Sequence, residues 1–257
     1  MIVRKSPEEI EKVAAAGQIL VRCLAMLKGK ARPGISTGAL DQAAERFIRS
    51  QGAEPAFKGY HGFPGSICAS PNSMIVHGIP GPYELRRGDV LSLDVGVVLD
   101  GWVADAAVTV AVGPISAVAA KLLEVTRGAL FDAVELCRPD NHLGDVSHAV
   151  QARVERAGFS VVRALVGHGV GRAMHEDPQI PNFGEPGSGP VLREGMVFAI
   201  EPMVNVGTDP IRMGEDSWAV YSQDGSLAAH FEHTVAVTAD GPRILTPWHA
   251  EEARRAA

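Results

Sequence analysis

Two aspartates inside a strongly apolar stretch constrain this chain more than any other feature. Asp94 and Asp105 lie in the segment 85–105, LRRGDVLSLDVGVVLDGWVAD, whose apolar alternation predicts two strands. Asp100, which with Gly101 forms the strongest short signal for a hairpin turn, lies six residues after Asp94 and five before Asp105. Folding the hairpin brings the two carboxylates close together. Because such carboxylates repel unless a proton or a cation lies between them, the segment predicts a divalent metal site.

An internal repeat favours this interpretation over the alternative that both aspartates are solvated residues of a strand edge or turn. Segment 192–201, LREGMVFAIE, matches 85–94, LRRGDVLSLD, and segment 232–237, EHTVAV, matches 105–110, DAAVTV. The chain is therefore predicted to form two similar halves, about 6–113 and 114–247, each with helices and a strand pair carrying two carboxylates. Facing halves would gather four carboxylates, which suits a site for two metal ions with oxygen ligands: Asp94, Asp105, Glu201 and Glu232.

Helical and strand patterns alternate along the rest of the chain. A capping box at Ser6 begins the first predicted helix, which ends at Gly29. Three more helices are predicted at about 36–51, 114–136 and 143–157, with strands at about 159–165, 196–206, 218–221 and 231–237 and a charged tail at 251–257. The segment 57–82 is predicted to be loop and strand. Because the hairpins imply antiparallel pairing, the expected class is α+β.

Composition excludes several classes of protein. The 257 residues suffice for one or two domains, and a hydrophobic content of 46% predicts a globular chain. A net charge of −6 argues against nonspecific binding of nucleic acid. The three cysteines are far apart and form no CxxC, so neither a zinc knuckle nor a disulfide framework is expected, and reduced thiols are typical of the cytoplasm. No apolar run approaches the roughly 18 residues of a membrane span, and no signal peptide is recognised.

Three histidines are candidates for chemistry. His168 lies in GHGVGR, where alternate glycines leave its ring uncrowded, although the spacing fails as a dinucleotide fingerprint. With Glu201 and Glu232 it forms a set that suits Mn, Fe, Co or Zn. His175 could point into the same cavity and His77 could donate to a substrate carbonyl; loop or strand-end roles are the alternatives. The remaining histidines singled out are interpreted as structural or surface residues: His142, His148, His230, His233 and His249.

Taken together, the five candidate ligands and the segments around them resemble the methionine aminopeptidases of type one. GHGVGR, EPMV and FEHT surround the last three ligands, and YHGFPGSICAS and VHGIPG match the family's substrate-side segments. The resemblance extends over about 6–247. It implies the "pita-bread" fold, a pseudo-two-fold α+β arrangement with a curved antiparallel sheet core and helices outside it. It also implies a single catalytic domain over 1–257 that removes the N-terminal methionine from nascent proteins and peptides with a small second residue.

The resemblance implies a role for each site residue. Asp94 would chelate one divalent ion, Asp105 and Glu232 would bridge two, and His168 and Glu201 would hold the second. The ions would be Co, Mn, Fe, Zn or Ni, and Glu201 would accept a proton and pass it to the leaving amine. His77 and His175 would stabilise the scissile carbonyl and bind substrate. The methionine pocket would be lined by Tyr60, Phe63, Cys68, Met174 and Trp218.

The chain departs from the common pattern of that family at a few positions. Met174 stands where Phe is common, Phe63 where Tyr is common, Gly96 where Thr is more usual, and Ala106-Ala107 where Thr-Ser is expected. These differences bear on pocket shape, on hydrogen bonds around the ligands and on metal affinity. Further implied properties are a cytoplasmic location, a monomeric state, transient association with the ribosome, and no requirement for nucleic acid or a membrane.

Two other functions stay open. Prolidases and Xaa-Pro aminopeptidases share the fold and the ligands, but they usually carry an additional N-terminal domain, and only 93 residues precede Asp94 here. A non-catalytic binding module of this fold would lack metal ligands, whereas all five are present. The 31-residue separation of Glu201 and Glu232 leaves no room for the insertion of the type two class. The short N-terminus, without a zinc-finger extension, is typical of a bacterial enzyme.

Overall fold

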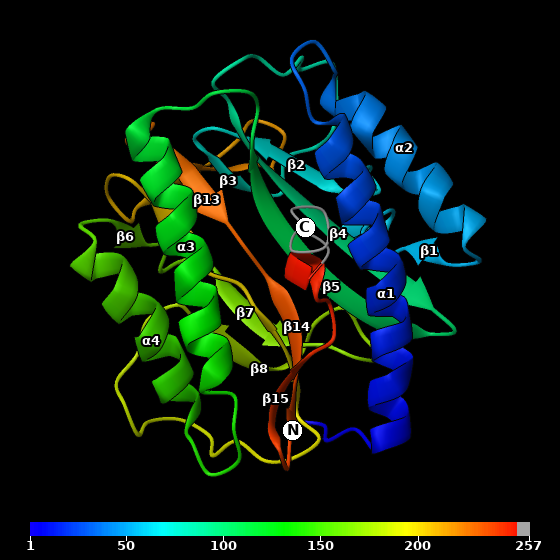
Figure 1. The fold of residues 1–257 in the computed structure, drawn as a ribbon, viewed down its shortest axis with the longest axis vertical. Helices are drawn as coiled ribbons and strands as arrows, with labels where there is room; N and C mark the ends of the chain where they lie inside the picture. The colour runs from blue at the N-terminus through cyan, green and yellow to red at the C-terminus, as the bar shows by residue number, and fades with distance from the viewer. Residues whose placement is uncertain (251–257) are drawn as a thin grey trace.

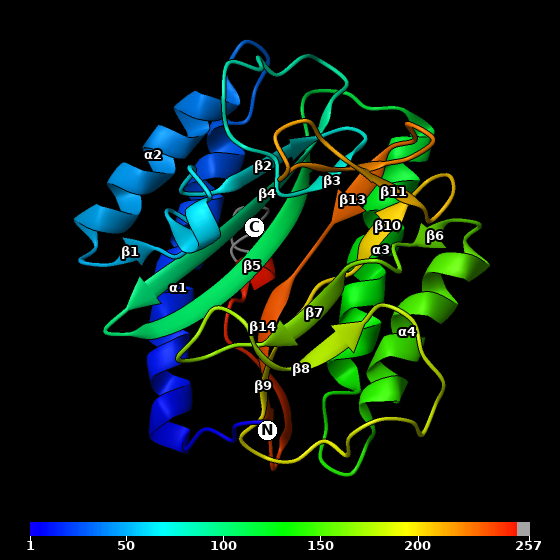
Figure 2. The ribbon, with the colours of Figure 1, turned by 180° about the vertical axis from the view of Figure 1, so that it is seen from behind.

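The structure, a computed structural model, describes residues 1–250, so that the charged tail predicted at 251–257 lies outside the described residues. It confirms the predicted α+β class, because four long helices accompany strands whose pairings over this range are antiparallel. The helices cover one side of the molecule (Figure 1), and the opposite side is formed mainly by strands and loops (Figure 2).

All four predicted helices are present. The first begins as predicted, since the Ser6 hydroxyl accepts a hydrogen bond from the N–H of Glu9 (3.3 Å) and the Glu9 carboxylate accepts one from the N–H of Ser6 (3.0 Å). The third begins three residues later than expected, after its cap Ser116. The helices are α1 (Pro7–Lys30), α2 (Thr37–Ser50), α3 (Ala117–Glu135) and α4 (Leu143–Arg156). α1 packs on α2 and on the predicted hairpin, and α3 packs on α4.

The strands form four sheets. The first has the order β1-β4-β2 with β5 paired to β4, and comprises β1 (Glu54–Pro55), β2 (Cys68–Pro71), β4 (Val90–Leu99) and β5 (Trp102–Ala111). The second has the order β15-β14-β9-β7-β8, and comprises β7 (Val166–Gly169), β8 (Glu176–Pro181), β9 (Val197–Ile200), β14 (His233–Thr238) and β15 (Gly241–Ile244).

Two small sheets complete the described strands. One has the order β13-β10-β6 and the other β11-β12-β3, and their strands are β3 (Met74–Val76), β6 (Ser160–Val161), β10 (Met203–Asn205), β11 (Ile211–Met213), β12 (Val220–Ser222) and β13 (Ala228–His230). A one-turn 3₁₀ segment, η1 (Tyr60–Gly62), precedes β2.

The predicted aspartate hairpin is confirmed in β4 and β5. Asp100 (φ 50°) and Gly101 (φ 73°) both have positive φ, as a two-residue turn of type I′ requires. The register places Asp94 opposite Ala107 and Asp105 opposite Gly96, so the carboxylates form a diagonal pair on one face of the hairpin.

Several predicted strands have wrong bounds, and the differences are informative. The predicted strand 196–206 is two strands, β9 and β10, because Pro202 lacks the N–H needed to continue the ladder and the chain changes sheets there. The predicted strand 231–237 begins at His233, and a separate strand, β13, ends at His230 in another sheet. Glu201 and Glu232 therefore both lie where the chain passes from one sheet to the next. The predicted strand 159–165 shortens to β6, and 218–221 shifts to β12.

The hairpin and the second large sheet meet through side-chain hydrogen bonds. The Thr234 hydroxyl accepts a bond from the N–H of Asp105 (3.0 Å) and donates one to its carbonyl oxygen (2.7 Å). The N–H of Glu232 donates to the Ala107 carbonyl oxygen (2.9 Å). These bonds hold Asp105 of the hairpin and Glu232 of the later segment next to each other.

Candidate metal centre and its cavity

One cavity of about 240 Å³ contains every site residue predicted from the sequence. Asp94 and Asp105 reach the cavity from the hairpin of β4 and β5. Glu201 and Glu232 reach it from the two points where the chain passes from one sheet to another, between β9 and β10 and between β13 and β14. The other predicted site residues that line it are Tyr60, Phe63, Cys68, His77, His168, Met174, His175 and Trp218. Residues that the sequence analysis did not assign also line it: Phe57, His61, Val76, Leu165, Val166, Met203 and His230.

Four carboxylates line one cavity, and three of them are buried while the Glu201 side chain is 13% exposed. The exposed fraction is 8% for Asp94, 4% for Asp105 and 1% for Glu232. Burial raises the pKa of Asp94 to about 7. Burial, together with repulsion from neighbouring carboxylates, raises the pKa values of Asp105, Glu201 and Glu232 well above their usual range. The cluster therefore favours bound protons or a bound cation.

His168, on β7, is oriented as a ligand. Its Nδ1 lies 2.8 Å from the carbonyl oxygen of Gly169, an arrangement in which Nδ1–H donates and Nε2 keeps its lone pair. Nε2 faces Glu201 Oε1 at 3.6 Å and Asp105 Oδ2 at 3.9 Å. Burial lowers the pKa of His168 to about 4, so the ring is neutral at pH 7.

The glycines beside His168 also permit close packing of neighbouring strands. A β-carbon on Gly167 would lie 2.4 Å from the Ala199 carbonyl oxygen, and one on Gly169 would lie 2.2 Å from that of Asp177. These residues allow β7 to approach β8 and β9 closely, and so hold His168 against the carboxylates.

The donor set fits a divalent metal ion. One ligand atom each of Asp105, His168 and Glu232 lies within 4.8 Å of the other two. Within residues 1–250, Asp94 Oδ1, Asp105 Oδ1 and Glu232 Oε1 are buried without a hydrogen-bond partner. Ala106 and Ala107, the predicted departures beside Asp105, are fully buried, and their methyl groups offer no hydrogen bond. Oxygen ligands with one imidazole suit Mn, Fe, Co or Zn.

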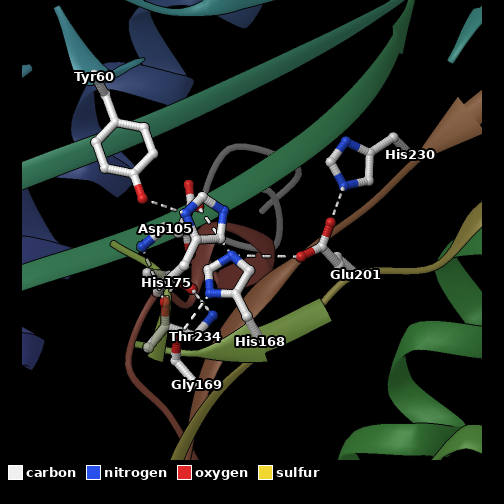
Figure 3. A network of polar contacts seen from close by, with 9 residues as sticks. Tyr60, Asp105, His168, Gly169, His175, Glu201, His230 and Thr234 are labelled. Carbon is white, nitrogen blue, oxygen red and sulfur yellow. Dashed lines mark hydrogen bonds and ion pairs between the residues drawn. The ribbon is translucent and has the colours of Figure 1, made fainter. Parts of the chain in front are cut away.

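A second histidine approaches the centre from the loop between β7 and β8. The His175 ring lies 4.2 Å from the His168 ring between centroids, and its Nδ1 lies 2.8 Å from the Tyr60 hydroxyl oxygen (Figure 3). Burial lowers the pKa of His175. His77, after β3, also lines the cavity and has a positive φ of 59°. Positive φ at a non-glycine residue is uncommon and is concentrated at functional sites.

The other side of the cavity is apolar. Phe63 meets Trp218 edge to face with ring centroids 5.1 Å apart, and Met174 is 6% exposed. Cys68 lies opposite Asp94 in the strand register, so the apolar pocket adjoins the carboxylates. Gly96 has room for no side chain, since its β-carbon would lie 2.7 Å from the ring of Phe57.

His230, interpreted from the sequence as a structural or surface residue, does not lie at the surface. It is 2% exposed, lines the cavity, and its Nε2 lies 3.7 Å from Glu201 Oε2 (Figure 3). Burial lowers its pKa to about 3. A signal was present, because His230 stands two residues before Glu232, the spacing of side chains that share one face of an extended chain. His233 is structural, being fully buried and stacked on Trp248.

Comparisons with known proteins agree on one family. The family model described as metallopeptidase family M24 matches residues 11–239. The chain is 52% identical over 246 residues to a methionine aminopeptidase of Clostridium perfringens, covering 96% of this chain and 99% of that protein. It is 51% identical to methionine aminopeptidase 1 of Bacillus subtilis over 96% of this chain and 99% of that protein.

Solved structures give the same result. A crystal structure of methionine aminopeptidase from Rickettsia prowazekii matches with a TM-score of 0.94 and 40% identity, over 96% of this chain and 100% of that one. A prolidase from Pyrococcus furiosus matches with a TM-score of 0.78 and 24% identity, over 95% of this chain and 65% of that one, a likeness of fold alone. Among the described residues, no helix is long and apolar enough to cross a membrane.

Proposed function

The chain belongs to metallopeptidase family M24, and on that premise we propose that it is a methionine aminopeptidase of type one, which removes the N-terminal methionine from peptides and nascent proteins. The main observation in its support is that one cavity contains both a cluster of possible metal ligands and an apolar pocket. Buried carboxylates with a histidine lie beside an apolar pocket walled by Phe63, Met174 and Trp218. A terminal methionine would present its amine and scissile bond to the first and its thioether to the second, where aromatic rings favour sulfur.

The proposed ligands divide between two divalent ions. Asp94 would hold one ion, Asp105 and Glu232 would bridge both, and His168 and Glu201 would hold the other. Ions held there, with Co, Mn, Fe, Zn and Ni as candidates, supply Lewis acidity and lower the pKa of water toward about 7. The unpartnered, buried oxygens of Asp94, Asp105 and Glu232 support this assignment.

Glu201 is the proposed general base and acid. Its raised pKa suits a carboxylate that takes a proton from the attacking water and then gives it to the departing amine. The side chain is 13% exposed, which leaves it accessible from the cavity while the rest of the cluster is more deeply buried.

His175 and His77 are the proposed donors to the scissile carbonyl. The Tyr60 hydroxyl oxygen lies 2.8 Å from Nδ1 of His175, whose pKa is lowered by burial. In the proposed arrangement the hydroxyl donates to Nδ1 of the neutral ring, so that the proton is on Nε2. Nε2–H can then donate to the carbonyl oxygen as negative charge develops on it. His77 would bind the same region of the substrate from the β3 side of the cavity. Phe63, Cys68, Met174 and Trp218, with the ring of Tyr60, would bind the methionine side chain.

We further propose a preference for a small second residue, the specificity that the resemblance to type one methionine aminopeptidases implies. A single catalytic domain of two pseudo-symmetric halves, a monomeric state, a cytoplasmic location and transient contact with the ribosome complete the proposal. The repeat at 85–94 and 192–201 supports the two halves. The three free, buried cysteines support a reducing, cytoplasmic location.

The test compares substrates with metal-free protein reconstituted with Mn, Co or Fe. Peptides beginning Met-Gly and Met-Ala are offered beside an Ala-Pro peptide of equal length, and released amino acids are quantified. Methionine alone is expected, with kcat reduced by at least 100-fold in Glu201→Gln. Preferential release of Ala would instead identify a prolidase, and absence of both bound metal and cleavage would identify a non-catalytic relative. The prolidase alternative has the weaker support, since the match to prolidases extends to fold alone.

A further inference from the structure

His230 is a buried polar side chain that the proposed mechanism leaves unused. It ends β13, and neither Nδ1 nor Nε2 has a hydrogen-bond partner within residues 1–250. Burying an imidazole without a hydrogen-bond partner costs free energy, and buried polar groups are normally hydrogen-bonded. The His230 side chain, which is 2% exposed at the cavity wall, is therefore expected to have a partner. The nearest acidic group is Glu201, whose Oε2 lies 3.7 Å from Nε2.

The framework fixes His230 independently of its ring. The Thr109 hydroxyl accepts a hydrogen bond from the N–H of His230 and donates one to its carbonyl oxygen, both at 2.8 Å. Met203, two residues after Glu201, is the register partner of His230 between β10 and β13. Bonds from β5 and β10 therefore determine where the imidazole stands, and the same strand pair ties it to the segment that carries Glu201.

The two oxygens of Glu201 face different histidines. Oε1 lies 3.6 Å from Nε2 of His168, and Oε2 lies 3.7 Å from Nε2 of His230 (Figure 3). Within the described residues, these are the ion-pair contacts recorded for the Glu201 carboxylate. The second distance would have to shorten by about 0.8 Å to reach the roughly 2.9 Å of an N–H···O bond.

We propose that His230 is a positioning residue for Glu201: its Nε2–H donates to Oε2 and holds the carboxylate with Oε1 on the His168 side. The expected effect of His230 on kcat rests on the proposed function. Its expected effect on metal affinity rests only on the positions of His230 and Glu201. The donor keeps one oxygen of Glu201 toward the candidate metal centre and restricts rotation of the carboxylate. Partners that orient ligands in this way typically change metal affinity or activity by about 10-fold to 100-fold when removed.

The test compares His230→Leu, which removes the donor at similar volume, with His230→Gln, whose amide can donate to the same oxygen. The exposed His148→Leu serves as the matched control. Calorimetric titration of each metal-free protein with Mn²⁺ gives affinities without reference to activity, and steady-state kinetics on a Met-Gly peptide gives kcat and KM. Thermal unfolding verifies that each variant folds.

We expect His230→Leu to weaken Mn²⁺ binding and lower kcat, each by about 10-fold or more, with KM changed less than about twofold. We expect His230→Gln to remain within about threefold of the parent protein on both measures. If His230→Leu keeps the Mn²⁺ affinity and the kcat of the parent protein, the inference is wrong. Equal losses in His230→Leu and His230→Gln would also overturn it, because they would show that packing of the ring matters and hydrogen bonding does not. If the parent protein fails to release methionine, the proposed function fails, and the Mn²⁺ affinities still decide the role of His230.

Discussion

At the scale of single residues, Tyr60 supplies a hydroxyl as well as a ring. The family resemblance predicts that the Tyr60 ring lines the methionine pocket. In the structure the Tyr60 hydroxyl oxygen also lies 2.8 Å from Nδ1 of His175. It is presented by a tight turn in which Gly59, His61 and Gly62 all have positive φ. Such a turn is intrinsically unfavourable and must be maintained by its surroundings, as is common where a side chain has to be aimed.

Replacing this hydroxyl is expected to affect turnover more than binding. In Tyr60→Phe the ring remains, but His175 loses the bond that fixes its tautomer. We expect kcat to fall about tenfold, equivalent to about 1.4 kcal/mol, with KM within about twofold. The control is Tyr83→Phe, which removes a hydroxyl bonded to Asp89 away from the cavity lining. Equal kcat values for Tyr60→Phe and the parent enzyme would refute the role.

Gly96 explains one departure from the common family pattern. The space that a side chain would need is filled by Ala56 and Phe57, which lie 2.8 Å and 2.7 Å from the position of its β-carbon. Phe57 lines the cavity, so the glycine and the phenylalanine together shape the pocket. The sequence showed the glycine but could not show which side chain had taken its space.

Gly96→Ala is therefore expected to displace Phe57. We expect the free energy of unfolding to fall by about 1–3 kcal/mol, as in overpacked cores, and KM for Met-Gly peptides to rise. Gly29→Ala is the control, since nothing lies within 4 Å of its β-carbon position, and it should change stability by less than about 1 kcal/mol. Urea unfolding of both variants provides the measurement. Similar stabilities of Gly96→Ala and the parent would contradict the packing argument.

At the scale of elements, the loop between β7 and β8 is held by the start of the chain. Lys5 Nζ lies 2.5 Å from Glu176 Oε2, with side chains only 2% and 11% exposed. Glu176 Oε1 accepts hydrogen bonds from the N–H groups of Arg172 (2.7 Å) and Ala173 (3.2 Å). Because this loop also carries Met174 and His175, the ion pair connects the N-terminal segment to both the pocket and the proposed oxyanion donor.

Lys5→Met is expected to lower the free energy of unfolding by about 3–5 kcal/mol, because it leaves the Glu176 carboxylate buried and unpaired. Lys5→Met combined with Glu176→Gln should recover much of the loss. The exposed pair Arg243–Glu11 is the control, and Arg243→Met should cost less than about 1 kcal/mol. Additive effects of the Lys5 and Glu176 substitutions would show that the pair does not act as a unit.

The same pair predicts a pH dependence. Burial raises the pKa of Glu176, but the hydrogen bond and charge of Lys5 and two N–H donors outweigh it, so the pKa is lowered overall. A carboxyl with a lowered folded-state pKa contributes stability above its unfolded value of 4.5, and loses it as pH falls further. The stability difference between Lys5→Met and the parent should therefore shrink below about pH 4.5. Chemical unfolding at pH 7 and pH 4 measures it, and an undiminished difference at pH 4 would argue against the ion pair.

The elements that local sequence determines were predicted well, and those set by distant partners were not. The helices and the hairpin of β4 and β5 follow from caps, turn residues and periodicity within a short window. β7 and β13 are short, and each pairs with a strand about 25 to 30 residues away, β9 and β10 respectively. The same limit applies to the site. The repeat identified the four carboxylates, but the position of His230 depends on Thr109 and β10, which the sequence gives no means to place.

At the scale of the whole molecule, the helices support one side while the cavity collects negative charge from several sheets. Four carboxylates with raised pKa values line the same cavity as a neutral His168. Protons and metal ions therefore compete for the same oxygens. A raised pKa keeps a carboxyl protonated to higher pH, so metal binding must release protons below that pKa.

Metal affinity is accordingly expected to rise with pH through the pKa of about 7 at Asp94. Calorimetry with Mn²⁺ at pH 6 and pH 8 should give a higher affinity at pH 8, by up to about tenfold per pH unit for each proton released. Titrations in buffers of different ionisation enthalpy count those protons. Asp94→Asn should flatten the dependence. An affinity independent of pH over this interval would contradict the raised pKa values.

The bonds between Thr234 and Asp105 span 129 positions of sequence, and this has a consequence in time. Contacts so distant along the chain form late, since a long loop must close before they contribute. Glu232 and Thr234 are also among the last residues of the described chain to be synthesised. A growing chain that has not yet reached residues 232–234 therefore lacks one candidate ligand, Glu232, and also the Thr234 hydroxyl that bonds to Asp105.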